Sequence, residues 1–186
     1  MIDDGGKFAE CGAELKQQKQ FCVDLETTGL DAVRADIVGW AFSWDGAAGY
    51  YLPVQAPAGE ATLDAQAVCD ALRPILENPD VEICNQNIKY DMLVLRRAGI
   101  NLRGVGVDSM VGSYLLDAGA RSHGLDELAR RYLEHEMIPI SDLIGKGKSQ
   151  IKISEVDVEK VGEYAAEDAQ IAWQLCQRIA TELKRE

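Results

Sequence analysis

Two carboxylates stand two residues apart in a short apolar stretch near the start of the chain. Asp24 and Glu26 lie within residues 21–30, a segment that predicts a buried strand followed by a turn. Side chains two residues apart on a strand face the same side of the sheet. Two such carboxylates in a low-dielectric site are unfavourable unless a cation compensates their charge. The pair therefore indicates either a metal site or a strand that runs out into a solvated acidic turn.

Two more acidic residues fall in segments with helical periodicity. Asp91 lies in the first turn of a helix expected over 87–98, where a carboxylate also interacts favourably with the positive end of the helix dipole. Tyr164 and Asp168 are four residues apart on a long helix expected over 156–183, so both point from one face. Each has an ordinary structural explanation, as a helix-stabilising acid or as part of an amphipathic helix.

The order of these motifs along the chain carries more information than any of them alone. The chain resembles the 3′→5′ exonuclease (proofreading) domain of bacterial DNA polymerase I, of family A, within the exonucleases that have a ribonuclease-H-like fold. That family carries Asp-x-Glu, Asn-x-x-x-Asp and Tyr-x-x-x-Asp in this order. The matching residues here are Asp24 and Glu26, then Asn87 and Asp91, then Tyr164 and Asp168. The tyrosine resembles that of the four-carboxylate subtype which also includes ribonuclease D.

This resemblance implies a catalytic site with two divalent metal ions. One ion would be held by Asp24, Glu26 and Asp168, and the second would share Asp24, with Asp91 acting mostly through bound water. Mg²⁺ is the expected metal, with Mn²⁺ or Zn²⁺ as alternatives. Two cations about 4 Å apart activate water and stabilise the charge that develops on a phosphodiester. Tyr164 would orient that water, because a phenol with an unperturbed pKa of about 10 is a weak base at neutral pH.

The resemblance also implies contacts with the substrate. Leu30 would wedge at the terminal bases, and Gln86 and Asn87 would contact the last nucleotides. Lys89 lies in the same polar entry to the helix over 87–98. Free backbone N–H groups at that entry would suit a phosphate.

A glycine-flanked loop supplies two further candidates. Lys146 and Lys148 would meet the phosphate backbone, and a mobile solvated turn is the alternative interpretation of this segment. Arg121 corresponds to a basic stretch of the family, but it is shifted by one position. Its role as a substrate contact is therefore left open.

Length, composition and charge bound the fold and the partners. The chain has 186 residues, of which 47% are hydrophobic, and this is enough for one domain with a substantial core. The formal net charge of −12 is unusual for an autonomous nucleic-acid binder, which normally carries a basic face. We expect a covalently linked polymerase domain to make most of the binding contacts with DNA. We further expect a cytoplasmic monomer without membrane contact, acting on a single-stranded or frayed DNA 3′ end.

The predicted architecture is an α/β fold, a mixed β-sheet flanked by helices. Strands are expected over 21–25, 37–44, 50–53, 81–84 and 104–107, and helices over 62–76, 87–98, 108–116, 125–132 and 156–183. Residues 1–20 are expected to be a polar lead-in, and residues 139–152 a loop. The exonuclease domain would cover 21–186 as a fragment of a larger DNA polymerase.

The cysteines and histidines predict no chemistry. The five cysteines are scattered without paired zinc-type spacing, so we expect reduced and mostly buried thiols. His123 and His135 are expected to be structural or surface residues.

Three functions fit the motifs. The first is a DNA exonuclease that releases 5′-mononucleotides during proofreading in replication and repair. The second is an RNA 3′ processing exonuclease of the ribonuclease D type, which shares the four carboxylates and the tyrosine. The third is a non-catalytic 3′-end-binding scaffold, which the retention of all four carboxylates disfavours.

Overall fold

A five-stranded mixed sheet forms the centre of the computed structural model, which describes residues 1–185. Glu186, the last residue of the predicted exonuclease domain, lies outside the described residues. The strands are β1 (Gln20–Thr27), β2 (Ile37–Ser43), β3 (Tyr50–Pro53), β4 (Glu82–Asn85) and β5 (Val105–Asp108). Their order across the sheet is β3-β2-β1-β4-β5. β1 pairs antiparallel with β2 and parallel with β4, and β4 pairs parallel with β5. β2 and β3 pair antiparallel, and the predicted mixed sheet is confirmed.

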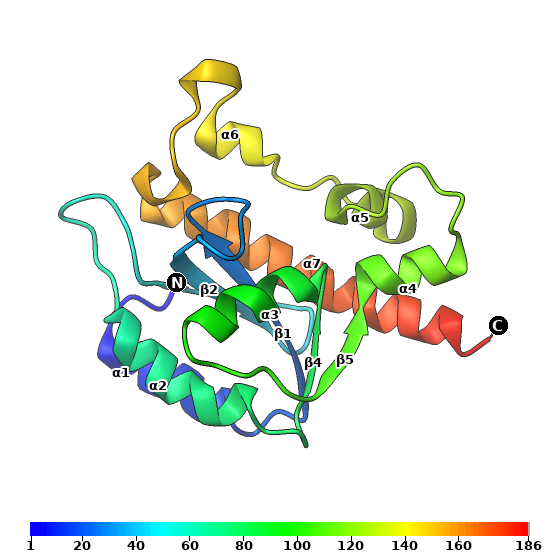
Figure 1. The fold of residues 1–186 in the computed structure, drawn as a ribbon, viewed down its shortest axis with the longest axis horizontal. Coiled ribbons are helices and arrows are strands. Elements are labelled where there is room, and N and C mark those ends of the chain that lie inside the picture. The colour runs from blue at the N-terminus through cyan, green and yellow to red at the C-terminus, as the bar shows by residue number, and fades with distance from the viewer. Residues whose placement is uncertain (186) are drawn as a thin grey trace.

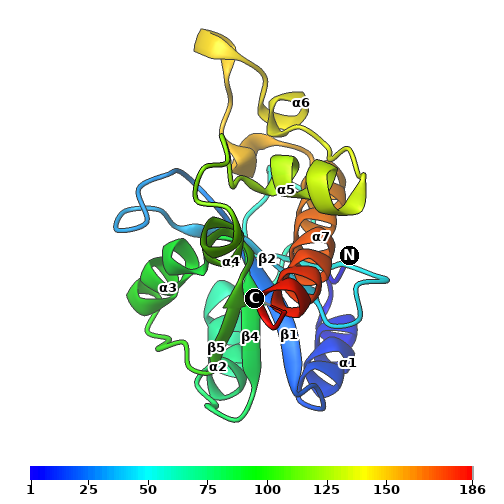
Figure 2. The same ribbon diagram turned by 90° about the vertical axis from the view of Figure 1, so that its right-hand side faces the viewer.

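Helices cover both faces of this sheet (Figure 1). They are α1 (Gly5–Leu15), α2 (Ala65–Leu76), α3 (Ile88–Arg97), α4 (Ser109–Leu116), α5 (Leu125–Leu133), α6 (Ile140–Ile144) and α7 (Val158–Leu183), with 3-10 turns η1 (Gly147–Ser149) and η2 (Ile153–Glu155). The long helix α7 crosses the sheet and contacts every strand. α6 and the turn after it stand away from the sheet in both views (Figures 1 and 2). The expected loop over 139–152 therefore contains two short helical segments.

Strand alternation separates the apolar and acidic side chains of β1. Phe21, Val23 and Leu25 join the main core cluster, which also contains side chains of α1, α2 and α3. Asp24 and Glu26 occupy the alternate positions and therefore face the other side of the sheet, where α7 lies. The predicted shared orientation of the two carboxylates is confirmed.

The N-terminal segment, which was expected to be a polar lead-in, contains the helix α1. Asp4 begins α1 as its N-cap, since its side chain accepts hydrogen bonds from the backbone N–H groups of Gly6 and Lys7. Cys11 and Leu15 are buried in the main core cluster. These two are the buried residues of α1, so its core-facing stripe is narrow.

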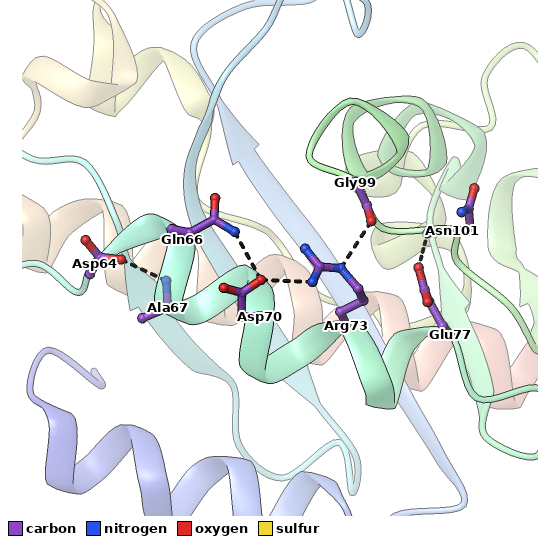
Figure 3. A network of polar contacts seen from close by, with 8 residues as sticks. All are labelled: Asp64, Gln66, Ala67, Asp70, Arg73, Glu77, Gly99 and Asn101. Atoms are coloured by element: carbon purple, nitrogen blue, oxygen red, sulfur yellow. Dashed lines mark hydrogen bonds and ion pairs between the residues drawn. The ribbon is translucent and has the colours of Figure 1, made fainter.

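Polar contacts tie α2 to the turn that follows α3 (Figure 3). The Arg73 guanidinium pairs with Asp70 and also donates to the carbonyl oxygen of Gly99, at 2.9 and 3.2 Å. Glu77 accepts a hydrogen bond of 2.8 Å from the backbone N–H of Asn101. Exposed ion pairs contribute little stability on their own, so their main effect is to fix the C-terminal end of α3.

Within residues 1–185, none of the helices combines the length and the apolarity needed to cross a bilayer.

Substitution of Leu15 measures how much α1 contributes to the fold. We predict that Leu15→Ala lowers the free energy of unfolding by about 2–5 kcal/mol, because it empties a fully buried site in the core. Leu115→Ala is the matched control, since Leu115 is 69% exposed on α4 and its removal should change stability by less than about 0.5 kcal/mol. Urea denaturation measures both, and equal effects would contradict a structural role for α1.

Candidate active site

Three of the predicted carboxylates meet where β1 faces α7. One carboxylate oxygen each from Asp24, Glu26 and Asp168 lie within 4.8 Å of one another. Glu26 and Asp168 are buried, at 8% and 9% exposure, and Asp24 is half-buried. Because α7 crosses the sheet and contacts β1, a helix residue far along the chain reaches the strand pair. The arrangement offers several oxygen ligands to one hard cation.

Asp91 joins this group through a shared partner. It lies in the first turn of α3 and is 3% exposed. The side-chain amide nitrogen of Asn85 donates to Asp91 Oδ2 at 3.0 Å and to Asp24 Oδ1 at 3.3 Å. Four carboxylates from β1, α3 and α7 therefore gather at the central strand of the sheet.

The four carboxylates lie close together, and three of them are buried. Burial raises the pKa of Glu26, and the neighbouring charges of Asp24, Asp168 and Asp91 raise it further. Burial and the charge of Asp24 likewise raise the pKa of Asp91 and of Asp168. Within residues 1–185, none of the four forms an ion pair with a lysine, arginine or histidine. The site therefore has an unbalanced negative charge that a divalent cation would compensate.

Tyr164 lies one helical turn before Asp168 and is half-buried. Burial and then the charge of Asp168 raise the pKa of its hydroxyl, which favours a neutral hydrogen-bonding group. Between them on α7, Glu167 accepts hydrogen bonds from the ring Nε2 of His135 and from the backbone N–H of Ile138, at 2.8 and 2.7 Å. The expected structural role of His135 is confirmed, since it fastens the segment after α5 to the helix.

The loop after β1 is fastened to α3 by a tyrosine. Tyr90 donates its hydroxyl hydrogen to the carbonyl oxygen of Gly29, and its oxygen lies 2.6 Å from Thr27 Oγ1. This contact sets the start of the loop that carries Leu30. Leu30 itself is 97% exposed. An exposed leucine suits the predicted wedge, which stays a prediction.

The polar entry to α3 differs from the sequence-based expectation. Asp108 accepts hydrogen bonds from the backbone N–H groups of Asn87 and Ile88, at 3.2 and 2.9 Å. These groups were expected to be free for a phosphate, and that expectation was wrong because a protein carboxylate occupies them. Asn87 adopts a left-handed backbone conformation, φ 61°, which turns the chain sharply from β4 into α3. Its contact with substrate stays a prediction.

Gln86 is held by the protein at both ends of its amide. Its nitrogen donates to the carbonyl oxygen of His123 at 2.7 Å, and its oxygen accepts from Ser109 Oγ. Lys89 is exposed and lines a groove of about 360 Å³ together with Tyr114 and His123. Substrate contacts of Gln86 and Lys89 also stay predictions.

The other basic candidates are at the surface. Lys146 and Lys148 are exposed in the turn after α6, the segment that stands away from the sheet. Arg121 is exposed in the connection between α4 and α5. The structure does not bring these three into the carboxylate group.

Two site residues were missed at the sequence level. Asn85 is fully buried between the carboxylates, yet its position at the end of β4 reads only as a polar turn. Tyr51 is buried on β3 against Gly39, and its hydroxyl has no hydrogen-bond partner within residues 1–185. Burial raises the pKa of this hydroxyl, and the charge of Glu26 raises it further. Its neighbour on β2, Gly39, pairs with Glu26, and a side chain at that glycine would overlap the Tyr51 ring. In the sequence, a glycine on the strand next to Glu26 was the feature that could have pointed to the position of Tyr51.

Comparison with known proteins identifies this arrangement. The sequence profile of a family described as 3′-5′ exonuclease matches residues 1–184. The chain belongs to this family. Because the match begins at residue 1, the family resemblance includes the N-terminal helix as well as the carboxylate motifs.

Relatives with similar sequence are DNA polymerases. DNA polymerase I of Pseudomonas aeruginosa is 39% identical over 188 residues, which cover 99% of this chain and 20% of the relative. DNA polymerase I of Rhizobium leguminosarum is 36% identical, with 82% of this chain and 17% of the relative covered. The chain thus spans about a fifth of the length of the relatives it matches.

Solved structures show the same ribonuclease-H-like exonuclease fold. The POL domain of Pol1 from M. smegmatis, in complex with DNA primer-template and dNTP, has a TM-score of 0.71 and 25% identity, and the match covers 98% of this chain and 27% of that one. Ribonuclease D of Trypanosoma brucei in complex with RNA U12 has a TM-score of 0.77 at 15% identity, with 96% and 61% covered. NrnC of Brucella melitensis has a TM-score of 0.72 at 21% identity, with 92% and 77% covered.

The raised pKa values of the carboxylates predict how stability responds to pH and metal. A carboxyl whose pKa is raised by folding stabilises the folded state below its unfolded pKa, and this contribution is lost as the pH rises through the folded pKa. Without divalent metal, we therefore predict that the free energy of unfolding falls as the pH rises above about 4, the ordinary pKa of a carboxyl group.

Glu26→Gln tests this prediction with a near-isosteric side chain. In chelator at pH 7.5 it should unfold at a higher urea concentration than wild type, because it removes one buried charge from the group. With saturating Mn²⁺ the order should reverse, since only the intact site gains full stabilisation from binding. Lower stability of Glu26→Gln in chelator at pH 7.5 would contradict the electrostatic interpretation.

Proposed function

We propose that this chain hydrolyses phosphodiester bonds at DNA 3′ ends and releases 5′-mononucleotides, with two divalent metal ions. The observation that carries the proposal is the gathering of Asp24, Glu26 and Asp168 within 4.8 Å, with Asp91 joined to Asp24 through Asn85. Membership of the 3′-5′ exonuclease family supports this direction of attack.

The residues present fit the metals that the proposal requires. Asp24, Glu26 and Asp168 would hold one ion, and Asp24 and Asp91 would take part in holding the second. Their oxygen ligands suit Mg²⁺ or Mn²⁺, and one structure of NrnC, a similar fold, contains bound Mg²⁺. When bound, the ions would neutralise the carboxylates and stabilise the negative charge that develops on the scissile phosphate.

The side chains of this chain would orient the reactants. Tyr164, beside Asp168, would hold the attacking water by its hydroxyl group and would stay protonated during the reaction. The loop fastened by Tyr90 would place Leu30 against the last base of the strand. Fixing both the water and the terminal nucleotide turns a bimolecular encounter into a positioned attack.

DNA is favoured over RNA as the substrate, and proofreading as the role. The relatives with 39% and 36% identity are DNA polymerases, whereas the ribonuclease D structure is only 15% identical and so bears on the fold alone. A polymerase domain on the same polypeptide would compensate the net charge of −12 by supplying the basic contacts to DNA. Leu30, Gln86, Asn87, Lys89, Lys146 and Lys148 remain the proposed substrate contacts.

A single assay tests the reaction, its direction and the substrate. Matched DNA and RNA single strands, labelled at the 5′ or the 3′ end, are incubated with Mg²⁺ or Mn²⁺. We predict a DNA ladder that shortens from the 3′ end and no turnover in chelator. Asp24→Ala is the control, and it should abolish turnover because Asp24 would serve both metals. A preference for RNA of about tenfold or more would instead support a ribonuclease, since such enzymes use the 2′-hydroxyl as a recognition group.

Tyr164→Phe separates orientation of water from metal binding. We predict that turnover falls by about 10- to 1000-fold, the usual cost of losing one well-placed hydrogen bond in the transition state. Mn²⁺ affinity should stay unchanged, because the phenyl ring keeps the packing of α7. Loss of Mn²⁺ binding in this variant would contradict the assigned role.

A further inference from the structure

Asn85 is a fully buried polar residue at the point where β4 ends. On one side of it lies Asp24 of the neighbouring strand β1, and on the other lies Asp91 of α3. It is therefore placed between the residue that would serve both metals and the residue that would serve the second. Neither the motif pattern nor the family comparison assigns it a role.

Every hydrogen-bonding group of the Asn85 side chain has a partner. A primary amide has two N–H donors, and here the same nitrogen lies 3.3 Å from Asp24 Oδ1 and 3.0 Å from Asp91 Oδ2. Its carbonyl oxygen accepts the thiol hydrogen of Cys22, at 3.5 Å. Two negatively charged groups are thus bridged by one neutral donor.

The two carboxylates and the Cys22 thiol together decide which way the amide faces. If the amide were turned over, its oxygen would face two carboxylate oxygens and its nitrogen would face the thiol. The first change places three acceptors together in a buried site, which is costly. Cys22 and Asp24 are on one face of β1, two residues apart, so strand geometry places the thiol beside the amide.

The backbone of Asn85 is fixed by two other elements. Its carbonyl oxygen accepts from Ser109 Oγ of α4 and from Cys176 Sγ of α7, both at 3.4 Å. The residue therefore has little freedom to move when the neighbouring carboxylates change partners. A rigid donor of this kind keeps two ligands at a set separation.

We propose that Asn85, oriented by the Cys22 thiol, is a positioning residue that holds Asp24 and Asp91 ready for the divalent metals. This inference rests on the proposed function, because it assumes that these two carboxylates serve metal ions. Asn85 itself contacts the carboxylates and not the reacting atoms.

The test measures affinity for Mn²⁺ alone, by electron paramagnetic resonance, on the 186-residue chain. Asn85→Ala should weaken Mn²⁺ binding by about tenfold or more, the usual range for the loss of a partner that orients metal ligands. Urea denaturation of each variant shows that it folds. A purely structural role would lower stability and leave the affinity unchanged.

A pair of substitutions at Cys22 tests the orientation of the amide. Cys22→Ala removes the donor and should weaken Mn²⁺ binding by about threefold or more. Cys22→Ser restores a donor, and its Mn²⁺ affinity should stay within about twofold of that of wild type. In the Asn85→Ala background, Cys22→Ala should add no further loss, because residues that act through one another are not additive. Ser113→Ala is the control, since Ser113 is equally buried but contacts His123 and Arg131.

The outcomes distinguish a failure of the proposed function from a failure of the role assigned to Asn85. If wild type neither binds Mn²⁺ nor shortens DNA, the proposed function fails and this inference fails with it. If wild type does both while folded Asn85→Ala binds Mn²⁺ as tightly, only the role of Asn85 is overturned. If Asn85→Ala does not fold, the Cys22 pair decides, and an unchanged affinity in Cys22→Ala overturns the proposal.

Discussion

Mutual repulsion among four neighbouring carboxylates, three of them buried, is the constraint around which this structure is arranged. Asp24, Glu26, Asp91 and Asp168 would separate or take up protons if the surrounding elements allowed it. The fold keeps them together by placing each on a regular element whose own packing is apolar and independent of the site. The free energy for holding like charges close therefore comes from two sets of apolar contacts. One is the hydrophobic core on the opposite face of β1, and the other is the packing of α7 against the sheet.

The approach of α7 to the sheet is the second requirement. Gly49, just before β3, packs so closely on α7 that a side chain there would overlap the backbone of Ala166. This contact lies between Tyr164 and Asp168 along the helix, so it sets how far both side chains reach toward β1. Ala165 and Ala169 are fully buried on the same helix. Small residues at a helix–sheet contact here serve the position of the site as much as the density of the core.

The acidic site and the acidic surface raise different physical questions. A metal-binding site needs concentrated negative charge, whereas a long phosphate backbone needs positive charge on the surface around it. Exposed candidates such as Lys89, Lys146 and Lys148 are few against a net charge of −12. The proposal of a covalently attached polymerase domain resolves this difference, because catalysis and affinity would then reside in separate parts of one polypeptide.

The sequence by itself determined the features that depend on local periodicity. The strand repeat of two residues places Asp24 and Glu26 on one face of β1. The helical repeat places Tyr164 and Asp168 on one face of α7. Tertiary structure decided the features that join distant segments. Asn85 lies 61 positions from Asp24, and Asp108 lies 20 positions from the N–H group of Ile88 that it occupies. Neither contact leaves a local pattern, because hydrogen bonds between elements depend on how strands and helices pack rather than on their own repeats.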